Sequence, residues 1–191
     1  ITASEVSDGG ASSDSTLSLT FTSSKSTSNF VVGDITVSGG SLGTLSGSGT
    51  TYTATFTPSG DGAKTINVAA STFTDSTGNN NSAATEFNWT YDTTNPTLSS
   101  SSPDDDATGV GLSDNIVLTF SEAVDVESSG TIVIKKTTGD ATVETITLPS
   151  SQVTGTGTTV ITINPAAAFN IATEYYVTIA STAFDDTSGN P

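Results

Sequence analysis

The sequence contains no cysteine and no histidine, and each absence excludes a class of chemistry. Without cysteine among its 191 residues, no disulfide can crosslink the chain. Zinc sites built on thiolate or imidazole ligands are excluded because the chain has neither cysteine nor histidine. The run Gly39-Gly40-Ser41-Leu42-Gly43 fits the G-x-S-x-G pattern of hydrolases, but that motif needs a strand-to-helix turn and a histidine base. No pair of acids is spaced to face across a cleft, as glycoside hydrolysis requires. We therefore expect that the chain is not an enzyme.

Positive charge is scarce as well. The chain has four lysines (Lys25, Lys64, Lys135 and Lys136) and no arginine, against 20 Asp and Glu residues, so the formal net charge is −16. A surface this acidic repels phosphate, so we expect no nucleic-acid partner and no attraction to anionic membranes. Cations are its natural counter-partners, and self-repulsion favours a soluble, monomeric chain.

Long apolar runs are also missing. No stretch approaches the ~20 apolar residues of a membrane-spanning helix, so we expect no membrane insertion in this segment. No signal peptide is recognisable, which leaves a cytosolic segment or one cut from a longer exported chain. The apolar share of 33% is low enough to suggest disorder. Regular alternation of apolar and polar residues favours thin, half-buried sheets instead.

That alternation runs through both halves of the chain. Leu17, Leu19 and Phe21 alternate with polar residues, and a matching pattern begins at Ile116. Further short strands with turns between them follow, and the nearest approach to a helix is a single turn suggested over 166–171. The sequence predicts an all-β fold of two tandem Greek-key β-sandwiches. We place the first in residues 1–94 and the second in residues 95–191, joined by a Pro96-containing linker.

One loop motif occurs once in each half. Residues 73–79 and 184–190 both read Phe-x-Asp-[Ser/Thr]-[Ser/Thr]-Gly-Asn, and each follows a short alternating strand. We call this motif the signature loop. We expect its Phe to anchor the loop, its Asp to cap the turn, and its Gly to take positive φ. A repeated loop after a repeated strand indicates an internal repeat of one architecture.

The two halves differ after the signature loop. In the first half an alternating aromatic strand follows, with Phe87, Trp89 and Tyr91. Trp89 is therefore predicted in the core rather than on a sugar-binding surface. In the second half we expect the last strand to be missing, with an unpaired sheet edge. This predicts an excerpt from a longer chain, with strand donation by a partner as the alternative.

Several segments resemble bacterial Ig-like repeats. The cues in the first half are Asp34–Gly40, Tyr52–Pro58, the signature loop and the linker that follows. In the second half they are Ser102-Pro103-Asp104, Ala107–Val110, Leu118–Asp125 and Gly189-Asn190-Pro191. The resemblance covers nearly the whole chain. It implies an Ig-like β-sandwich in a secreted or cell-surface adhesin of the biofilm-associated type, used as a spacer or adhesive repeat, often with calcium at the junctions between modules.

Calcium is the leading chemical hypothesis, because Ca²⁺ takes six to eight oxygen ligands. In a seven-strand sandwich the signature loop, the loop between strands two and three and the incoming linker meet at one pole. We expect ligands there from Asp92, Glu122, Asp125, Asp185, Asp186 and Asn190. A weaker site of the same kind in the first half would use Asp75 and Asn79, although Lys25 stands where acids would be needed. The alternative is that each Asp only caps its own turn.

Other functions have less support from the sequence. The Thr-rich strand at 51–57 could bind ice or glycan, although threonine is a common surface residue of strands. A Lys–Asn crosslink would need a buried lysine, and none stands inside an apolar pattern. The sequence thus favours a structural spacer stiffened by Ca²⁺, with neighbouring repeats of the same chain as partners. A module that binds a surface glycan or a protein receptor is the alternative.

Overall fold

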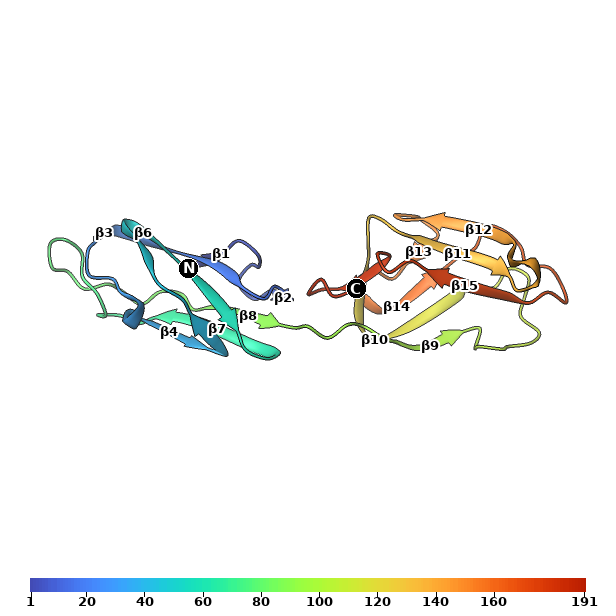
Figure 1. The fold of residues 1–191 in the computed structure, drawn as a ribbon, viewed down its shortest axis with the longest axis horizontal. Helices are drawn as coiled ribbons and strands as arrows, with labels where there is room; N and C mark the ends of the chain where they lie inside the picture. The colour runs from blue at the N-terminus through green and yellow to red at the C-terminus, as the bar shows by residue number, and fades with distance from the viewer. The chain divides into compact units, whose positions relative to one another are not determined.

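The computed structural model describes all 191 residues, and the chain divides into two compact units (Figure 1). Unit 1 comprises Ile1–Thr93 and unit 2 comprises Thr94–Pro191. Each unit is built from β-strands in two sheets, and the only helical elements are two short 3-10 turns. The predicted all-β fold of tandem β-sandwiches is confirmed. None of the helical elements is long and apolar enough to cross a membrane.

Unit 1 contains eight strands and one 3-10 turn. They are β1 (Thr2–Ala3), β2 (Ala11–Ser12), β3 (Leu17–Thr27), η1 (Val32–Asp34), β4 (Ile35–Ser38), β5 (Gly40–Leu42), β6 (Ser46–Pro58), β7 (Gly62–Val68) and β8 (Phe87–Tyr91). One sheet has the order β1-β3-β6-β5 and the other has the order β2-β8-β7-β4. Neighbouring strands are antiparallel except for β2, which pairs in parallel with β8.

Alternation along the strands builds the core of unit 1. Leu17, Leu19 and Phe21 of β3 point inward, opposite Phe56, Ala54 and Tyr52 of β6 in register. The second sheet adds Ile66 from β7 and Phe87 and Trp89 from β8. Trp89 is 2% exposed and its ring meets that of Phe56 edge-on, with 5.0 Å between centroids. The prediction that Trp89 belongs to the core is confirmed.

Lys64 contradicts the prediction that no lysine lies in an apolar environment. It sits on the core face of β7 with Ile66 and is 2% exposed. Its aliphatic stem is buried, while its ammonium group donates to the Gly62 carbonyl oxygen at 3.0 Å and lies 5.8 Å from the centroid of the Tyr91 ring. A long lysine side chain can bury its methylenes and place its charge at the end of a sheet, which alternation does not reveal.

Unit 2 also contains eight strands. They are β9 (Leu98–Ser102), β10 (Ile116–Val126), β11 (Thr131–Lys136), β12 (Thr142–Thr147), β13 (Val153–Thr154), β14 (Thr158–Ile163), β15 (Tyr175–Ile179) and β16 (Phe184–Asp186), with the turn η2 (Thr138–Asp140) after β11. One sheet has the order β13-β14-β10-β16, with β9 also paired to β10, and the other is the three-stranded β12-β11-β15. The helical turn suggested over 166–171 does not form, and those residues are loop.

The core of unit 2 is mostly aliphatic. Leu118, Val124, Ile132, Ile146 and Ile161 pack between its sheets, and Phe184 of the signature loop closes one end. Phe184 meets Phe120 edge-on at 5.6 Å. The anchoring role predicted for the loop phenylalanine is confirmed here. In the three-stranded sheet, β15 is an edge strand that pairs with β11.

A candidate metal centre at the signature loop of unit 2

The signature loop of unit 2 is held by the carboxylate of Asp186. Its Oδ1 accepts hydrogen bonds from the backbone amides of Ser188 and Asn190, both at 2.8 Å. Its Oδ2 accepts one from Asn190 Nδ2 at 2.8 Å. Gly189 takes the predicted positive φ of 85°, which turns the backbone so that both amides point at the carboxylate. Asp186 is 4% exposed, so these bonds satisfy a buried charge.

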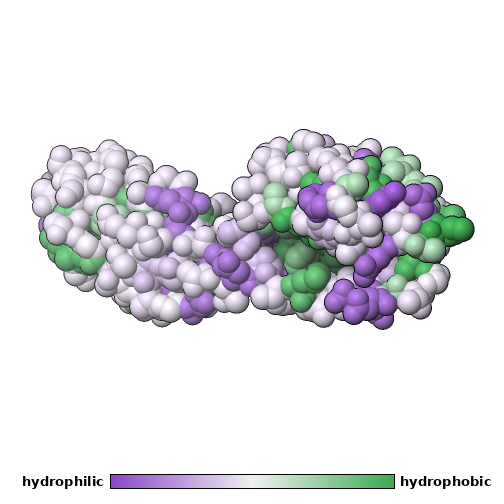
Figure 2. All heavy atoms as spheres, turned by 45° about the vertical axis from the view of Figure 1, so that its right-hand side comes forward, coloured by the Kyte–Doolittle hydropathy of each residue, from purple (hydrophilic) through white to green (hydrophobic).

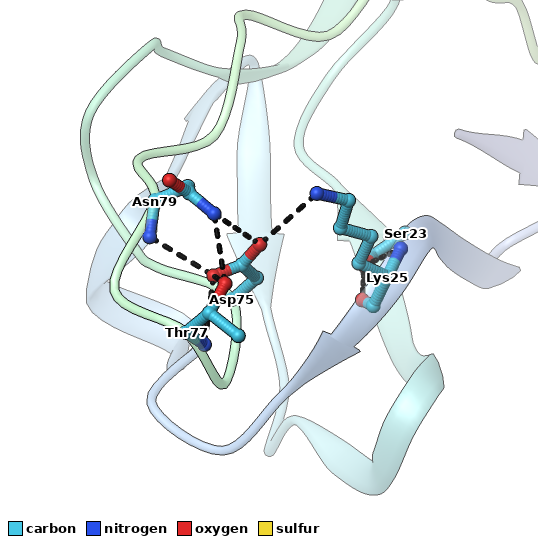
Figure 3. A network of polar contacts seen from close by, with 5 residues as sticks. All are labelled: Ser23, Lys25, Asp75, Thr77 and Asn79. Atoms are coloured by element: carbon cyan, nitrogen blue, oxygen red, sulfur yellow. Dashed lines mark hydrogen bonds and ion pairs between the residues drawn. The ribbon is translucent and has the colours of Figure 1, made fainter.

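The signature loop of unit 1 repeats this arrangement (Figure 3). Oδ1 of Asp75 accepts from the amides of Thr77 and Asn79 and from the Thr77 hydroxyl, and Oδ2 accepts from Asn79 Nδ2. The hydrogen bonds from Asn79 and Thr77 hold the pKa of Asp75 well below its usual range. The predicted capping of the turn by aspartate is therefore confirmed in both copies.

The two loops differ in the charge that faces the aspartate. In unit 1 the ammonium group of Lys25 lies 3.3 Å from Asp75 Oδ2 and points at it (Figure 3). With this ion pair the carboxylate has five donors, which fills the roughly four lone-pair sites that it offers. A tethered ammonium thus stands where a bound cation would have to sit. At the weaker site predicted at Asp75 and Asn79, the structure thus places Lys25 against the carboxylate, and the prediction of Ca²⁺ there stays a prediction.

In unit 2 an acid, and not a lysine, lies near the loop aspartate. Carboxylate oxygens of Glu122 and Asp186 lie within 4.8 Å of one another. Glu122 belongs to β10, at the point where its pairing with β14 is interrupted between Thr119 and Val124. Lys25 belongs to the matching irregular part of β3, between Thr22 and Thr27. The irregular stretch of the second long strand therefore positions the partner of the loop aspartate in both units.

A further group of acids lies next to this pair. Asp125 and Asp185 are direct cross-strand partners in the β10–β16 ladder. Burial, a hydrogen bond that the protonated Asp185 donates to the Glu127 carboxylate, and the nearby negative charges of Glu127 and Asp125 raise the pKa of Asp185 to about 6. Asp125 accepts a hydrogen bond from the Thr156 hydroxyl at 2.8 Å. Sequence reasoning missed Glu127, which stands just beyond the motif-bearing residues and is the main neighbour of Asp185.

The residues predicted as ligands thus have different places. The carboxylates of Asp186 and Glu122 lie close together. Asn190 donates hydrogen bonds to Asp186 from its backbone N–H and from its side-chain Nδ2. Asp125 and Asp185 face each other across the ladder, and Asp92 directly follows β8 at the end of unit 1. Chemically, closely spaced carboxylate oxygens suit a hard cation such as Ca²⁺.

Comparison with known families agrees with this architecture. A model described as a bacterial Ig-like domain matches residues 2–91, and a second model with the same description matches residues 92–191. The chain belongs to the bacterial Ig-like domain family. Ig-like domains of bacteria are often extracellular or surface-exposed, and their families are generally non-enzymatic. No match was found among curated proteins or among solved structures.

Proposed function

We propose that this pair of bacterial Ig-like domains is an extracellular spacer segment of a surface adhesin, and that Ca²⁺ bound at the signature loop of unit 2 stiffens it. Two bacterial Ig-like β-sandwiches in tandem are the kind of repeated module from which a spacer can be built. The net charge of −16 keeps such modules soluble and apart from each other. A spacer of this kind would carry a binding or anchoring domain away from the cell.

The observation that carries the calcium part of the proposal is the close approach of the carboxylates of Asp186 and Glu122. Two carboxylates within 4.8 Å repel each other, the more so because Asp186 is buried. In unit 1 the same loop aspartate is neutralised by Lys25. A divalent cation would perform in unit 2 what the lysine performs in unit 1.

The coordination chemistry is compatible with Ca²⁺. The hydrogen bonds within the loop use three of the roughly four lone-pair sites of Asp186 and leave one on Oδ2. Glu122 can supply one or two oxygens. Backbone carbonyls and water would complete the six to eight oxygens that Ca²⁺ requires.

Thermal unfolding tests this proposal. Extracellular modules bind Ca²⁺ with a Kd of about 10⁻⁴ M, so about 10 mM Ca²⁺ would stabilise unit 2 by ~2.7 kcal/mol. The melting midpoint of unit 2 should rise by roughly 10 °C relative to EDTA. Glu122→Gln should remove most of that rise, whereas Asp105→Asn, which removes the same charge from an exposed turn, should keep it. Equal midpoints with Ca²⁺ and EDTA would refute the calcium part and leave the spacer part standing.

A hollow in unit 1 favours a second candidate function, the binding of a surface glycan or protein receptor. It has a volume of about 470 Å³, within the usual range of ligand sites. Phe21, Phe30 and Phe73 line it on the inside, and Lys25 and Asn79 line it on the polar side. A glycan array probed with this chain would detect such binding. Lys25→Ala should then weaken the binding. No binding to any glycan on the array would argue against this candidate.

A further inference from the structure

The hollow beside the signature loop of unit 1 has a floor of aromatic rings. The ring of Phe30 lies at its centre, with its centroid 4.8 Å from that of Phe73, 5.2 Å from that of Tyr52 and 5.9 Å from that of Phe21. Three of these rings are almost fully buried, whereas Phe73 is half-buried. The counterpart of Phe73 in unit 2, Phe184, is only 7% exposed. Phe73 is therefore the ring that keeps the most surface for a ligand.

Apolar surface of this kind stands out on unit 1. Figure 2 shows one side of unit 1, the unit on the left, where most of the surface has intermediate hydropathy and apolar side chains show in few places. This agrees with a chain in which serine and threonine cover the outer faces of the strands. Roughly half of the residues that line the hollow are nevertheless polar, so it offers an apolar floor together with a polar rim.

The rim has hydrogen-bond donors to spare. The side chain of Lys25 is 68% exposed, and its ammonium group spends one of its three donors on Oδ2 of Asp75 (Figure 3). The exposed side chains of Ser24 and Asn80 also line the hollow and can donate. Asp75 is the only acid among the lining residues, and its lone pairs are already filled by the loop. The rim thus favours a ligand that brings acceptor oxygens.

The floor and the rim are held in a fixed relation to each other. The Ser76 amide of the signature loop donates to the Ser26 carbonyl at 3.2 Å, next to Lys25. On the other side of the loop, Asn81 Oδ1 accepts from the Phe73 amide at 3.1 Å. The half-buried ring and the ammonium group are therefore positioned before a ligand arrives, which lowers the ordering cost of binding.

A sugar ring suits this combination better than a purely apolar ligand. A pyranose has C–H groups on its faces, which can pack on an aromatic ring, and oxygens around its edge, which can accept from the rim. A purely apolar acid would leave the donors of Ser24 and Asn80 desolvated without partners. A neutral sugar would leave the positive charge of Lys25 unused. A sugar that carries a carboxylate uses the floor, the hydroxyl and amide donors and the ammonium group together.

The acidity of the whole chain does not oppose this assignment strongly. At physiological ionic strength, charges more than about 8 Å away are largely screened. Within the hollow the charge of Asp75 is balanced by Lys25, so the two remaining ammonium donors decide the local preference.

We propose that the hollow of unit 1 binds a carboxylated sugar, a hexuronate unit of an acidic polysaccharide, with its ring against Phe73 and its carboxylate on Lys25. This inference rests on the second candidate function, the binding of a surface glycan, and names the class of glycan. It does not depend on calcium.

The test is an NMR titration of the ¹⁵N-labelled full chain in EDTA, so that no metal bridges protein and sugar. The probes are the methyl glycosides of glucuronic and galacturonic acid, each compared with its neutral parent, methyl glucoside or methyl galactoside. At least one uronide should bind about fivefold more tightly than its neutral parent, as one partly exposed ion pair allows. Its titration should shift the backbone amides of Lys25, Phe73 and Asn80.

Variants of Lys25 locate the preference. Lys25→Gln should make the uronide and its neutral parent bind equally, and Lys25→Arg, which keeps the charge, should retain the preference. Lys136→Gln is the matched control, because it removes the same charge from unit 2. The melting midpoint of unit 1 in each variant shows that the fold is intact.

Four results would overturn the inference. Equal binding of the uronides and their neutral parents would refute the choice of an acidic sugar and leave the second candidate function standing. No binding of any of the four sugars would refute both. Cyclohexanecarboxylate bound as tightly as the uronides would show that the hollow selects an acid and not a sugar. Shifts confined to amides away from the hollow would refute the site.

Discussion

Replacing Asp186 by alanine in EDTA should destabilise unit 2 by about 2–4 kcal/mol, even without any metal. The carboxylate accepts three hydrogen bonds of 2.8 Å inside a buried loop. Hydrogen bonds to a charged group contribute roughly 1.5–3 kcal/mol each, although losses within one loop are not additive. Relief of repulsion from Glu122 would return on the order of 1 kcal/mol. The melting midpoint of unit 2 should therefore fall by about 8 °C or more.

Calorimetry or circular dichroism on the full chain measures this shift. Thr187→Ala is the matched control, because Thr187 is exposed and lies in the same loop. Glu122→Gln separates the two roles of the site, since it removes a cation ligand and leaves the loop hydrogen bonds intact. A midpoint for Asp186→Ala within about 2 °C of the Thr187→Ala control would refute the reasoning that this carboxylate holds the loop.

Three further predictions concern other parts of the two units. The pKa of Asp185 is raised to about 6, so the folded state binds this proton more tightly than the unfolded chain does. Ionisation of Asp185 therefore lowers the stability of unit 2 as the pH rises from about 4 to above 6. Asp185→Asn should then stabilise unit 2 by about 1 kcal/mol at pH 7.5 in EDTA and by nothing at pH 4, which melts at both pH values would reveal. Trp89→Ala should destabilise unit 1 by about 3–5 kcal/mol in urea unfolding, whereas Trp89→Phe should cost far less, because the buried indole N–H has no hydrogen-bond partner to lose. Burial alone would raise the pKa of Glu144, but hydrogen bonds from Gln152 and two backbone amides lower it overall. The stabilisation of the folded state by ionised Glu144 is therefore present above its ordinary pKa and is lost as the pH falls below it. Glu144→Ala should accordingly speed hydrogen exchange of the Ala166 and Ala167 amides at pH 7, and unchanged exchange would contradict that role.

Much of the fold could be predicted because it follows from local patterns. Apolar residues alternate with polar ones at Leu17, Leu19 and Phe21, which predicts a strand with one buried face. The structure has this strand. The signature loop was recognisable because glycine at positive φ and aspartate as a cap are local requirements. Gly78 and Gly189 both take positive φ, at 89° and 85°.

What could not be predicted depends on contacts between distant segments. The burial of Lys64 depends on where its ammonium group ends, which alternation does not encode. Glu122 was predicted in a loop but lies within β10, where an interruption of the pairing turns it toward Asp186. The contact of Glu127 with Asp185 arises from the pairing of β10 with β16, two strands far apart in the sequence.

The central claim, that unit 2 uses a bound cation where unit 1 uses Lys25, is tested most directly by isothermal titration of Ca²⁺ into the full chain. The account predicts one site with a Kd of about 10⁻⁴ M. Glu122→Gln should abolish it and Asp105→Asn should leave it unchanged. No heat of binding up to about 10 mM Ca²⁺, or a site that survives Glu122→Gln, would contradict the account.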